Sequence, residues 1–384
     1  MTKNDVVIIG AGPAGSYLAY KLQKLGIKTL ILEKNVFPRY KTCGGGLSKK
    51  AYDILFRDNK NVENIIEKKI KKGLYIRNQK ITSRESEEDL IYMTYRSKLD
   101  NFLVNMAVDN KTVFLKENIT IKKINQIENI VTYRENNKEK TASYNILIGA
   151  WGHNVNLNKL VDLYPFNRYA ISSSWEGPPG PKFSKYFEEY AVCQIMSSYP
   201  GVVGYIFPKS KMITAGLFTS LYPVPFNLKK AWNEFAEYWK LDSNINPRYA
   251  VIPIRDFKKP IAKNNILLIG DAAGLADSFT GEGLYQAFLS GMIASKNIKD
   301  FFEIDNYNLS NNYTQEINTQ LLDMEKWAKI YEFLFHHFPN FSFWLGSESF
   351  FGYEILKSFL TGNIRYNEIR KIINHFIEKT IYQI

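Results

Sequence analysis

The sequence predicts an α/β fold in which helices cover a parallel sheet, a second antiparallel sheet is inserted, and further helices follow. Three patterns carry this prediction. Residues 5–33 have the pattern of strand, glycine turn, helix and strand, residues 264–291 that of strand, turn and helix, and residues 169–220 hold four strand-like runs. Because apolar strands alternate with helices in the first two segments, these segments belong to one layered domain.

The segment at residues 5–33 has the pattern of a dinucleotide-binding site. "VVIIG" suits a buried parallel strand, "GAGPAG" forms the turn, and "KTLILE" is the second strand. In this Rossmann arrangement the glycines make the turn and admit the pyrophosphate, while the helix N-terminus faces the phosphates. A purely structural glycine turn is the alternative. The expected nucleotide contacts are Gly10, Gly12, Ala14, Gly15, Glu33 (on ribose hydroxyls) and Lys34.

Residues 264–291 indicate which dinucleotide binds, since the first segment alone fits either FAD or NAD. The strand "ILLIG" is followed by Asp271, a turn of small residues and a helix that begins near Gly283. The pattern "GDAAG…GEG" resembles the second flavin motif of the p-hydroxybenzoate hydroxylase-like flavoproteins, whose aspartate contacts the FAD ribitol. The resemblance implies FAD as the cofactor, and an ordinary turn between strand and helix is the alternative. The contacts that it implies are Asp271, Gly281, Gly283 and Leu284.

Four motifs narrow the resemblance to one family. "FPRYKTCGGGL" (37–47), "YIFPKSKMITAGLF" (205–218), "GDAAGLADSFTGEGL" (270–284) and "LTGNIRYNEI" (360–369) together resemble the geranylgeranyl reductase family. These flavoenzymes hydrogenate isolated double bonds of isoprenoid chains, such as archaeal lipid tails, a chlorophyll precursor or a menaquinone side chain. The resemblance also implies that Arg96, in "YRSKLDNFLVNMA" (95–107), contacts FAD.

The segment "KTCGGGL" places a thiol beside three consecutive glycines, which cost backbone entropy and are rarely kept without cause. We hypothesise that Gly44, Gly45 and Gly46 let the main chain lie along the flavin ring, with Gly46 also beside the substrate. Cys43 would then lie at the ring edge where the alkene arrives. Saturating a double bond needs a hydride and a proton, and a thiol is a suitable proton source. The alternative is that Cys43 is a small buried hydrophobic side chain in a turn.

The runs "YAISSSWEG", "KYFEEYAVCQIM", "GVVGYIFPK" and "MITAGLF" predict an antiparallel sheet that covers the flavin. In relatives the "FPK" motif lines the substrate cavity, which implies substrate contacts for Tyr205, Phe207 and Pro208. Tyr205 is, with Cys43, the catalytic candidate. The family pattern has Tyr and Trp at the positions of Val203 and Tyr205 here. The alternative is that these aromatic residues fill the core of the sheet.

A second departure from the family pattern concerns the electron donor. Relatives have "GADG" where this chain has "LIGAWGHN" (147–154), so Trp151 replaces an aspartate. Because that motif helps to bind FAD and, in hydroxylases, the reductant, its change disfavours direct use of NAD(P)H. The net charge of +12, with eight basic and three acidic residues in 57–80, suits an acidic ferredoxin or flavodoxin. A solvated lysine-rich face and an anionic membrane surface are the alternatives, and no nucleic-acid partner is expected.

Composition and the C-terminal third set further expectations. Two cysteines cannot form a disulfide framework, the N-terminal residues enter a strand at once, and no run approaches the roughly twenty apolar residues of a membrane span. We therefore expect a cytoplasmic protein. The aromatic segment 325–360 either docks on a membrane surface, caps a cavity for a polyprenyl tail, or forms a helical subdomain. His336 and His337 lack a Cys or carboxylate cluster, so no metal site is expected.

The expected FAD-binding domain is discontinuous. It comprises 1–75, 95–155 and 260–300, with a substrate domain at 76–94 and 156–259 and a helical region at 301–384. The resemblance implies an FAD-dependent reductase that saturates double bonds of a polyprenyl chain on a lipid, quinone or chlorophyll precursor, by hydride transfer from flavin N5 plus a proton. Two alternatives stay open. One is a flavin-dependent monooxygenase or halogenase, and the other is a non-catalytic flavin-binding electron carrier on a membrane.

Overall fold

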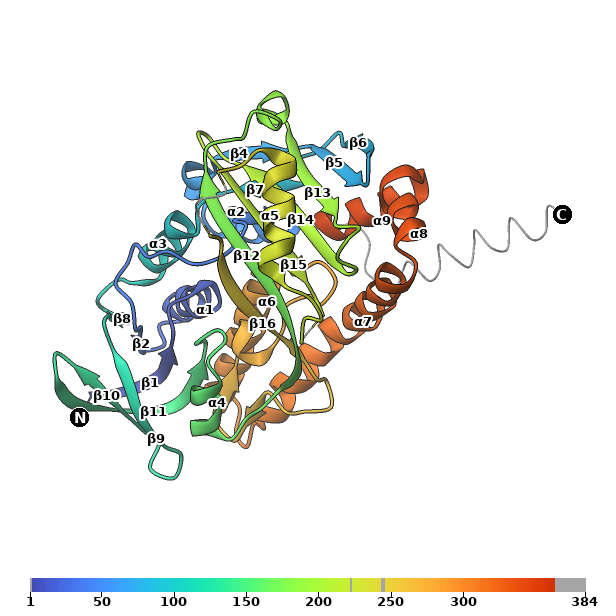
Figure 1. Ribbon diagram of the computed structural model, residues 1–384. Helices are drawn as coiled ribbons and strands as arrows, with labels where there is room; N and C mark the ends of the chain where they lie inside the picture. The colour runs from blue at the N-terminus through green and yellow to red at the C-terminus, as the bar shows by residue number, and fades with distance from the viewer. Residues whose placement is uncertain (1, 222, 243–245, 363–384) are drawn as a thin grey trace.

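The structure is a computed structural model that describes residues 2–221, 223–242 and 246–362. Two large sheets and one small sheet are packed with helices (Figure 1). The α/β class, with a second sheet and a C-terminal helical region, is confirmed. The segment 363–369, which belongs to the last of the four motifs, lies outside the described residues.

The first sheet carries the glycine turns at the carboxyl ends of its strands. Strands β18, β11, β1, β2 and β8 lie side by side and run parallel, and β9, β10 and β17 extend the sheet with antiparallel pairs. Both faces of β1 and of the carboxyl-terminal part of β11 are largely covered, which explains the continuous apolar runs there. The strands are β1 (Thr2–Ile9), β2 (Thr29–Leu32), β8 (Val113–Lys116), β9 (Thr120–Asn125), β10 (Ile130–Glu135), β11 (Lys138–Gly149), β17 (Ala262–Lys263) and β18 (Ile266–Leu268).

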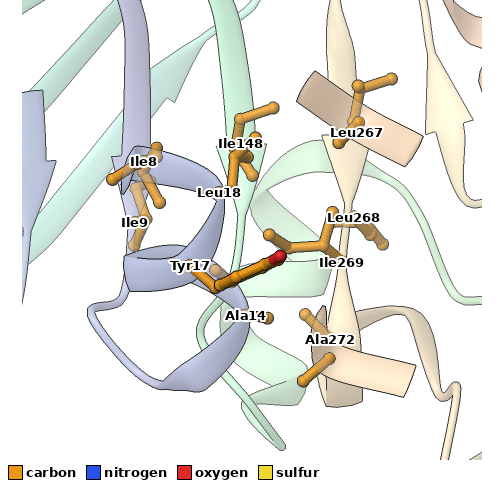
Figure 2. Close-up of a cluster of buried hydrophobic side chains, with 14 of the residues drawn as sticks. Ile8, Ile9, Ala14, Tyr17, Leu18, Ile148, Leu267, Leu268, Ile269 and Ala272 are labelled. Atoms are coloured by element: carbon orange, nitrogen blue, oxygen red, sulfur yellow. The ribbon is translucent and has the colours of Figure 1, made fainter. Parts of the chain in front are cut away.

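Helices α1 (Pro13–Lys24) and α6 (Leu284–Glu303) pack together on this sheet. Figure 2 shows Tyr17 and Leu18 of α1 in one apolar cluster with Ile148 of β11 and Leu268 of β18. The helices approach closely because Gly291 has no side chain, and a Cβ there would lie 3.3 Å from the Leu18 nitrogen. This packing brings the two glycine-rich turns of the sequence to the same edge of the sheet.

The second sheet has the order β16, β12, β15, β14, β13, β5, β6 and is antiparallel except for the β13–β5 pair. Because β5 spans residues 72–77, the domain boundary that the sequence places after residue 75 falls inside this strand. The strand-like run at 185–196 forms a strand only from Tyr190 onward. The strands are β5 (Lys72–Arg77), β6 (Lys80–Glu85), β12 (Phe166–Gly177), β13 (Tyr190–Ile195), β14 (Val202–Pro208), β15 (Ile213–Thr219) and β16 (Arg248–Arg255). A third sheet joins β3 (Gly46–Ser48), β4 (Lys68–Ile70) and β7 (Ile91–Met93).

Strand β14 shows that the two faces of the second sheet pack against different parts of the molecule. Helix α5 (Leu228–Trp239) covers one face, where Ile206 packs in a cluster with Trp232 and Phe235 (Figure 1). Because side chains alternate along a strand, Val203, Tyr205 and Phe207 point to the opposite face. That face covers the edge of the first sheet where the glycine turns lie.

The C-terminal helices lie together along one side of the molecule, next to the second sheet (Figure 1). Within the described residues, no helix is both long and apolar enough to cross a membrane. The remaining helices are α2 (Lys49–Asp58), α3 (Arg96–Ala107), α4 (Val155–Val161), α7 (Leu309–His337), α8 (Pro339–Phe343) and α9 (Phe350–Thr361), with the short helical turns η1 (Lys60–Ile65), η2 (Ser184–Tyr186), η3 (Gly270–Ala273) and η4 (Trp344–Glu348).

Candidate active site

A cavity of 1310 Å³ lies between the carboxyl edge of the first sheet, the inner face of the second sheet and the C-terminal helices. Sixteen of the eighteen site residues expected from the sequence contribute to its lining: Gly10, Gly12, Ala14, Glu33, Lys34, Cys43, Gly44, Gly45, Gly46, Arg96, Tyr205, Phe207, Asp271, Gly281, Gly283 and Leu284. Gly15 and Pro208 lie behind this surface, where Gly15 packs against the Gly10 carbonyl and Pro208 ends β14. The fold thus gathers both nucleotide motifs and the triple glycine around one cavity.

The turn before α1 has the space and the free donors that a nucleotide phosphate requires. The N-cap residue Gly12 offers the helix no side-chain hydrogen bond, so the first N–H groups of α1 are uncapped. Gly10 has a φ of +105°, and a Cβ there would lie 2.4 Å from the Ala150 carbonyl oxygen. Arg39 extends to Gly12, and its buried Nε has no hydrogen-bond partner in the described part of the chain. The free Nε–H of this guanidinium group, beside an uncapped helix, suits a phosphate.

Glu33 directly follows β2, and its carboxylate is held at the cavity wall. Oε2 accepts a hydrogen bond from the Ala11 N–H at 2.7 Å, and Oε1 accepts one from the Asn35 N–H at 2.9 Å. The side chain is only 4% exposed, yet it contributes to the cavity lining. The two hydrogen bonds fix the carboxylate next to the glycine turn, where the sequence interpretation places the ribose.

Arg96 belongs to a buried charge cluster that the sequence revealed only in part. Its Nε and Nη2 donate to Asp100 at 2.8 and 3.0 Å, and Nη2 of Arg39 lies 3.1 Å from the same carboxylate. Burial alone would lower the pKa of Arg96, but the Asp100 carboxylate and the Cys43 sulfur raise it. Asp100 is fully buried and therefore holds two guanidinium groups at the cavity. The i, i+4 spacing on α3 was the available sequence signal for one of these pairs.

The three glycines after Cys43 are required by neighbouring parts of the protein itself. An added Cβ on Gly44 would lie 2.7 Å from the Phe207 ring, and one on Gly46 would lie 2.9 Å from the Ile91 side chain. On Gly45, whose φ is +75°, it would lie 2.2 Å from the Thr94 carbonyl oxygen. Strands β7 and β14 thus approach this segment too closely for any side chain. This packing is a second reason for the glycines, beside the room for a flavin that the sequence interpretation gave.

Cys43 lines the cavity and is partly exposed. The Gly45 N–H donates to its Sγ at 3.4 Å, and the Arg96 guanidinium also interacts with the sulfur. A cation and an N–H group directed at one sulfur stabilise negative charge on it. These two contacts fix the Cys43 sulfur at the cavity wall.

Two lysines near the triple glycine were not singled out from the sequence. Lys209, the last residue of "FPK", is fully buried, and its Nζ donates to the Gly44 carbonyl oxygen at 3.1 Å and to the Thr214 hydroxyl. Burial lowers the pKa of Lys209 to about 8. Lys41 lines the cavity, and burial lowers its pKa against the opposing effect of the Asp271 carboxylate. The site is therefore richer in positive charge than its motifs suggest.

Tyr205 and Phe207 form the wall of the second sheet that faces the triple glycine. Their ring centroids are 5.0 Å apart. The Tyr205 hydroxyl donates to the Ser173 carbonyl oxygen at 2.5 Å, and burial raises the pKa of Tyr205. Tyr205 therefore keeps its proton, which is engaged by the backbone.

Trp151 gives the end of β11 an apolar surface. Its indole N–H donates to Asn158 at 3.0 Å, and its ring fills the space beside Gly149. The side chain is 9% exposed and contributes to the cavity lining. An indole side chain therefore lines the cavity just beyond the end of β11.

Beyond the triple glycine, the cavity is lined by apolar side chains that the sequence did not assign to the site. They come from the second sheet and from α7, α8, η4 and α9, and include Ile195, Val203, Phe218, Leu334, Phe335, Phe343, Leu345, Ile355, Leu356 and Phe359. The C-terminal helices therefore complete the cavity. An apolar lining of this extent suits a ligand that has few polar groups.

Known proteins resemble this chain over most of its length. Residues 3–170 match the family described as an FAD binding domain. Digeranylgeranylglycerophospholipid reductase from Thermoplasma acidophilum is 26% identical over 80% of this chain and 81% of its own length. A protein of Methanosarcina barkeri that is described as uncharacterized is 31% identical over 83% of this chain and 81% of its own length. The chain belongs to the geranylgeranyl reductase family of FAD-dependent oxidoreductases.

A solved structure shares the fold of this geranylgeranyl reductase family member. The crystal structure of a geranylgeranyl bacteriochlorophyll reductase-like protein from Thermoplasma acidophilum matches it with a TM-score of 0.79 at 22% identity, over 90% of this chain and 91% of the other. The cofactor is FAD, and the uncapped α1, Glu33 and Arg39 fit its phosphate and ribose groups. Within the described ranges, no group of three or more His, Cys, Asp or Glu side chains could hold a metal ion.

Proposed function

We propose that this FAD-dependent oxidoreductase saturates isolated carbon–carbon double bonds in the polyprenyl chain of a lipid or quinone. The observation that carries the proposal is the continuity of the FAD cavity with the apolar space between the second sheet and the C-terminal helices. At 1310 Å³, the cavity exceeds the roughly 300–1,000 Å³ of a typical small-molecule site. It therefore has room for the cofactor and a second, apolar ligand. A relative named for a digeranylgeranyl lipid substrate supports the same proposal.

The residues around Cys43 supply what the reaction needs besides the cofactor. When bound and reduced, FAD supplies a hydride to one carbon of the double bond. The other carbon needs a proton, which we assign to the Cys43 thiol. The Arg96 guanidinium and the Gly45 N–H then stabilise the negative sulfur. Because Cys43 is partly exposed, solvent returns the proton, so that the alkene has gained two hydrogens and the thiol is restored.

Tyr205 has a different role in this proposal. Its hydroxyl proton is engaged by the Ser173 carbonyl, and its raised pKa opposes release of that proton. Tyr205 and Phe207 instead form a fixed aromatic wall that confines the alkene beside Cys43. Their contribution is orientation of an otherwise featureless hydrocarbon chain.

For the electron donor we propose a ferredoxin or flavodoxin in preference to NAD(P)H. Trp151 removes the carboxylate that the family places near the reductant, and the net charge of +12 attracts an acidic protein. The attraction is not concentrated in segment 57–80, because four of its lysines are ion-paired with glutamates. These four are Lys68, Lys69, Lys72 and Lys80.

We also propose that the C-terminal helices dock on a membrane surface. Four aromatic side chains of α7, α8 and the residues beside them are about half exposed: Phe333 (54%), Phe338 (53%), Phe341 (48%) and Trp344 (48%). Aromatic side chains are favoured at the boundary between lipid and water. Phe343, from the same segment, lines the cavity. A lipid tail could therefore pass from the membrane into the cavity without crossing water.

The test compares the two cysteines that line the cavity. Cys43→Ala removes the proposed acid, and Cys193→Ser is the matched control because burial raises the pKa of Cys193 to about 11. Each protein is reduced with dithionite under anaerobic conditions and incubated with geranylgeranylated lipids and quinones. The masses of the products are then measured by mass spectrometry. We expect Cys43→Ala to bind FAD normally and to lose about 10²–10⁴-fold in turnover, while Cys193→Ser stays active.

The outcomes separate the chemistry from the assignment of the acid. Full turnover by Cys43→Ala would remove the role of the thiol but keep the reductase. A wild-type protein that binds and reduces FAD but adds no hydrogen to any polyprenyl compound would contradict the proposed function.

A further inference from the structure

We propose that Lys209 is a positioning residue, which fixes the triple-glycine segment 43–47 and places a buried positive charge behind it that makes bound FAD easier to reduce. The inference rests on the proposed function only in that segment 43–47 faces the cofactor. Lys209 does not line the cavity and has no part in the reaction described above. Its effect on the cofactor must therefore pass through the segment or through its electric field.

The contacts of Lys209 tie three parts of the chain together. Its Nζ donates to the Gly44 carbonyl oxygen at 3.1 Å and to the Thr214 hydroxyl of β15, and it lies 5.0 Å from the centroid of the Tyr95 ring. Two hydrogen bonds and one cation–π contact account for the donors of an ammonium group. Tyr95 is the N-cap of α3, whose first residue Arg96 interacts with Cys43. Lys209 thus connects both ends of the arrangement that holds the thiol.

The positive charge of Lys209 has no direct counter-charge in the described part of the chain. Glu176 of β12 is linked to it only through Thr214, whose hydroxyl lies 3.5 Å from Glu176 Oε1. The groups that act on the ammonium from surrounding elements are Glu176, Glu67, Cys43 and the Tyr95 ring. Glu67 is already paired with Lys98. A buried charge without a partner costs free energy, and it is useful where negative charge develops nearby.

Reduction of FAD adds negative charge to the cofactor, so the ammonium favours the reduced state. By linkage, reduction strengthens proton binding to Lys209 by the same free energy. Burial lowers the pKa of Lys209 to about 8. The ammonium is therefore present below that pH and is lost as pH rises through it, and the support for the reduced cofactor is lost with it.

The experiment measures the midpoint potential of the FAD-loaded protein by spectroelectrochemistry from about pH 6 to about pH 10. Lys209→Met removes the charge and keeps the bulk, Lys209→Arg keeps the charge, and Lys211→Met is the matched control, because Lys211 is exposed in the same hairpin. We expect Lys209→Met to have a lower potential than wild type below pH 8 and the same potential well above it. Lys209→Arg should keep the higher potential throughout, and Lys211→Met should follow wild type.

A second readout separates the mechanical role from the charge. Thr214→Val removes one acceptor and keeps the ammonium, so the amides of residues 43–46 should exchange hydrogen faster while the potential at pH 7 is unchanged. If Lys209→Met has the wild-type potential at every pH, the proposal is wrong. If that variant does not fold, the wild-type protein alone decides: a midpoint potential that shows no bend near pH 8 when plotted against pH would also make the proposal wrong. No polyprenyl substrate is used, so failure to find a saturated product leaves this result standing.

Discussion

Replacing Gly45 with alanine separates the cost of an unusual backbone conformation from the cost of a close approach. Gly45 has a φ of +75°, and an added Cβ would lie 2.2 Å from the Thr94 carbonyl oxygen. Gly26 has nearly the same φ, +70°, but nothing lies within 4 Å of an added Cβ, so Gly26→Ala is a matched control. A left-handed conformation costs an ordinary residue about 1–2 kcal/mol. Displacing the backbone after β7 adds about 1–3 kcal/mol, as in other overpacked sites.

We therefore expect Gly26→Ala to lower the free energy of unfolding by about 1–2 kcal/mol and Gly45→Ala by about 2–5 kcal/mol. The clash cannot be relieved by a side-chain rotation, because the opposing atom is backbone and the Thr94 N–H donates to the Gly45 carbonyl at 2.8 Å. Equilibrium urea denaturation with an unchanged m-value measures both losses. Equal losses for the two variants would refute the reasoning that β7 excludes a side chain here.

Three further predictions concern the charge cluster, the reductant and the membrane surface. Asp100→Asn removes the fully buried carboxylate that pairs with two largely buried guanidinium groups, and it should lower the free energy of unfolding by about 3–5 kcal/mol. Glu303→Gln, in an exposed pair, should cost at most about 1 kcal/mol. Similar small losses for both variants would show that Asp100 is not an anchor. A reduced ferredoxin or flavodoxin should reduce the bound FAD faster than NADPH in stopped-flow mixing, and comparable rates would remove the argument from Trp151. Replacing Phe341 and Trp344 with serine should weaken sedimentation with anionic vesicles but preserve turnover of detergent-dispersed substrate, and unchanged vesicle binding would contradict the proposed docking.

The nucleotide-binding half of the site could be predicted from the sequence because its signals are local. Gly10 and Gly12 lie within one turn between a strand and its helix, and Asp271 lies in a second turn of the same kind. The residues that such a turn requires are adjacent in the sequence, so the pattern can be recognised without knowledge of the fold. The structure places both turns on one cavity, as parallel strands with shared carboxyl ends require.

The remainder of the site depends on contacts between distant parts of the chain. Lys209 contacts Gly44 across 165 positions of the sequence, and Arg39 pairs with Asp100 because α3, which carries Asp100, packs against α1. The "FPK" motif implied a substrate contact for Phe207 and no role for Lys209. The burial of Lys209 follows from strand alternation and from its position at the end of a hairpin strand, which a motif does not encode.

The fold shows the same division. The runs that became β14 and β15 were recognisable from their apolar pattern, as were the strands around the first glycine turn. The position of β5 was not, because it pairs in parallel with β13, and Lys72 is opposite Tyr190 in that register. Parallel pairing between distant strands leaves no turn signal in the sequence. Likewise, the sequence identified the segment that contains α7 to α9 as aromatic and helical, but it did not show that these side chains line the cavity.

A single-turnover experiment tests most directly whether electrons pass from FAD to a polyprenyl double bond. The wild-type protein is reduced under anaerobic conditions and mixed with a geranylgeranylated lipid. The visible absorbance of oxidised flavin is followed, and the mass of the lipid product is measured by mass spectrometry. We predict that the flavin is reoxidised in step with the lipid, one cofactor for each gain of two hydrogens. Flavin that stays reduced with every polyprenyl compound, or a product that forms only in air and gains oxygen, would contradict this prediction.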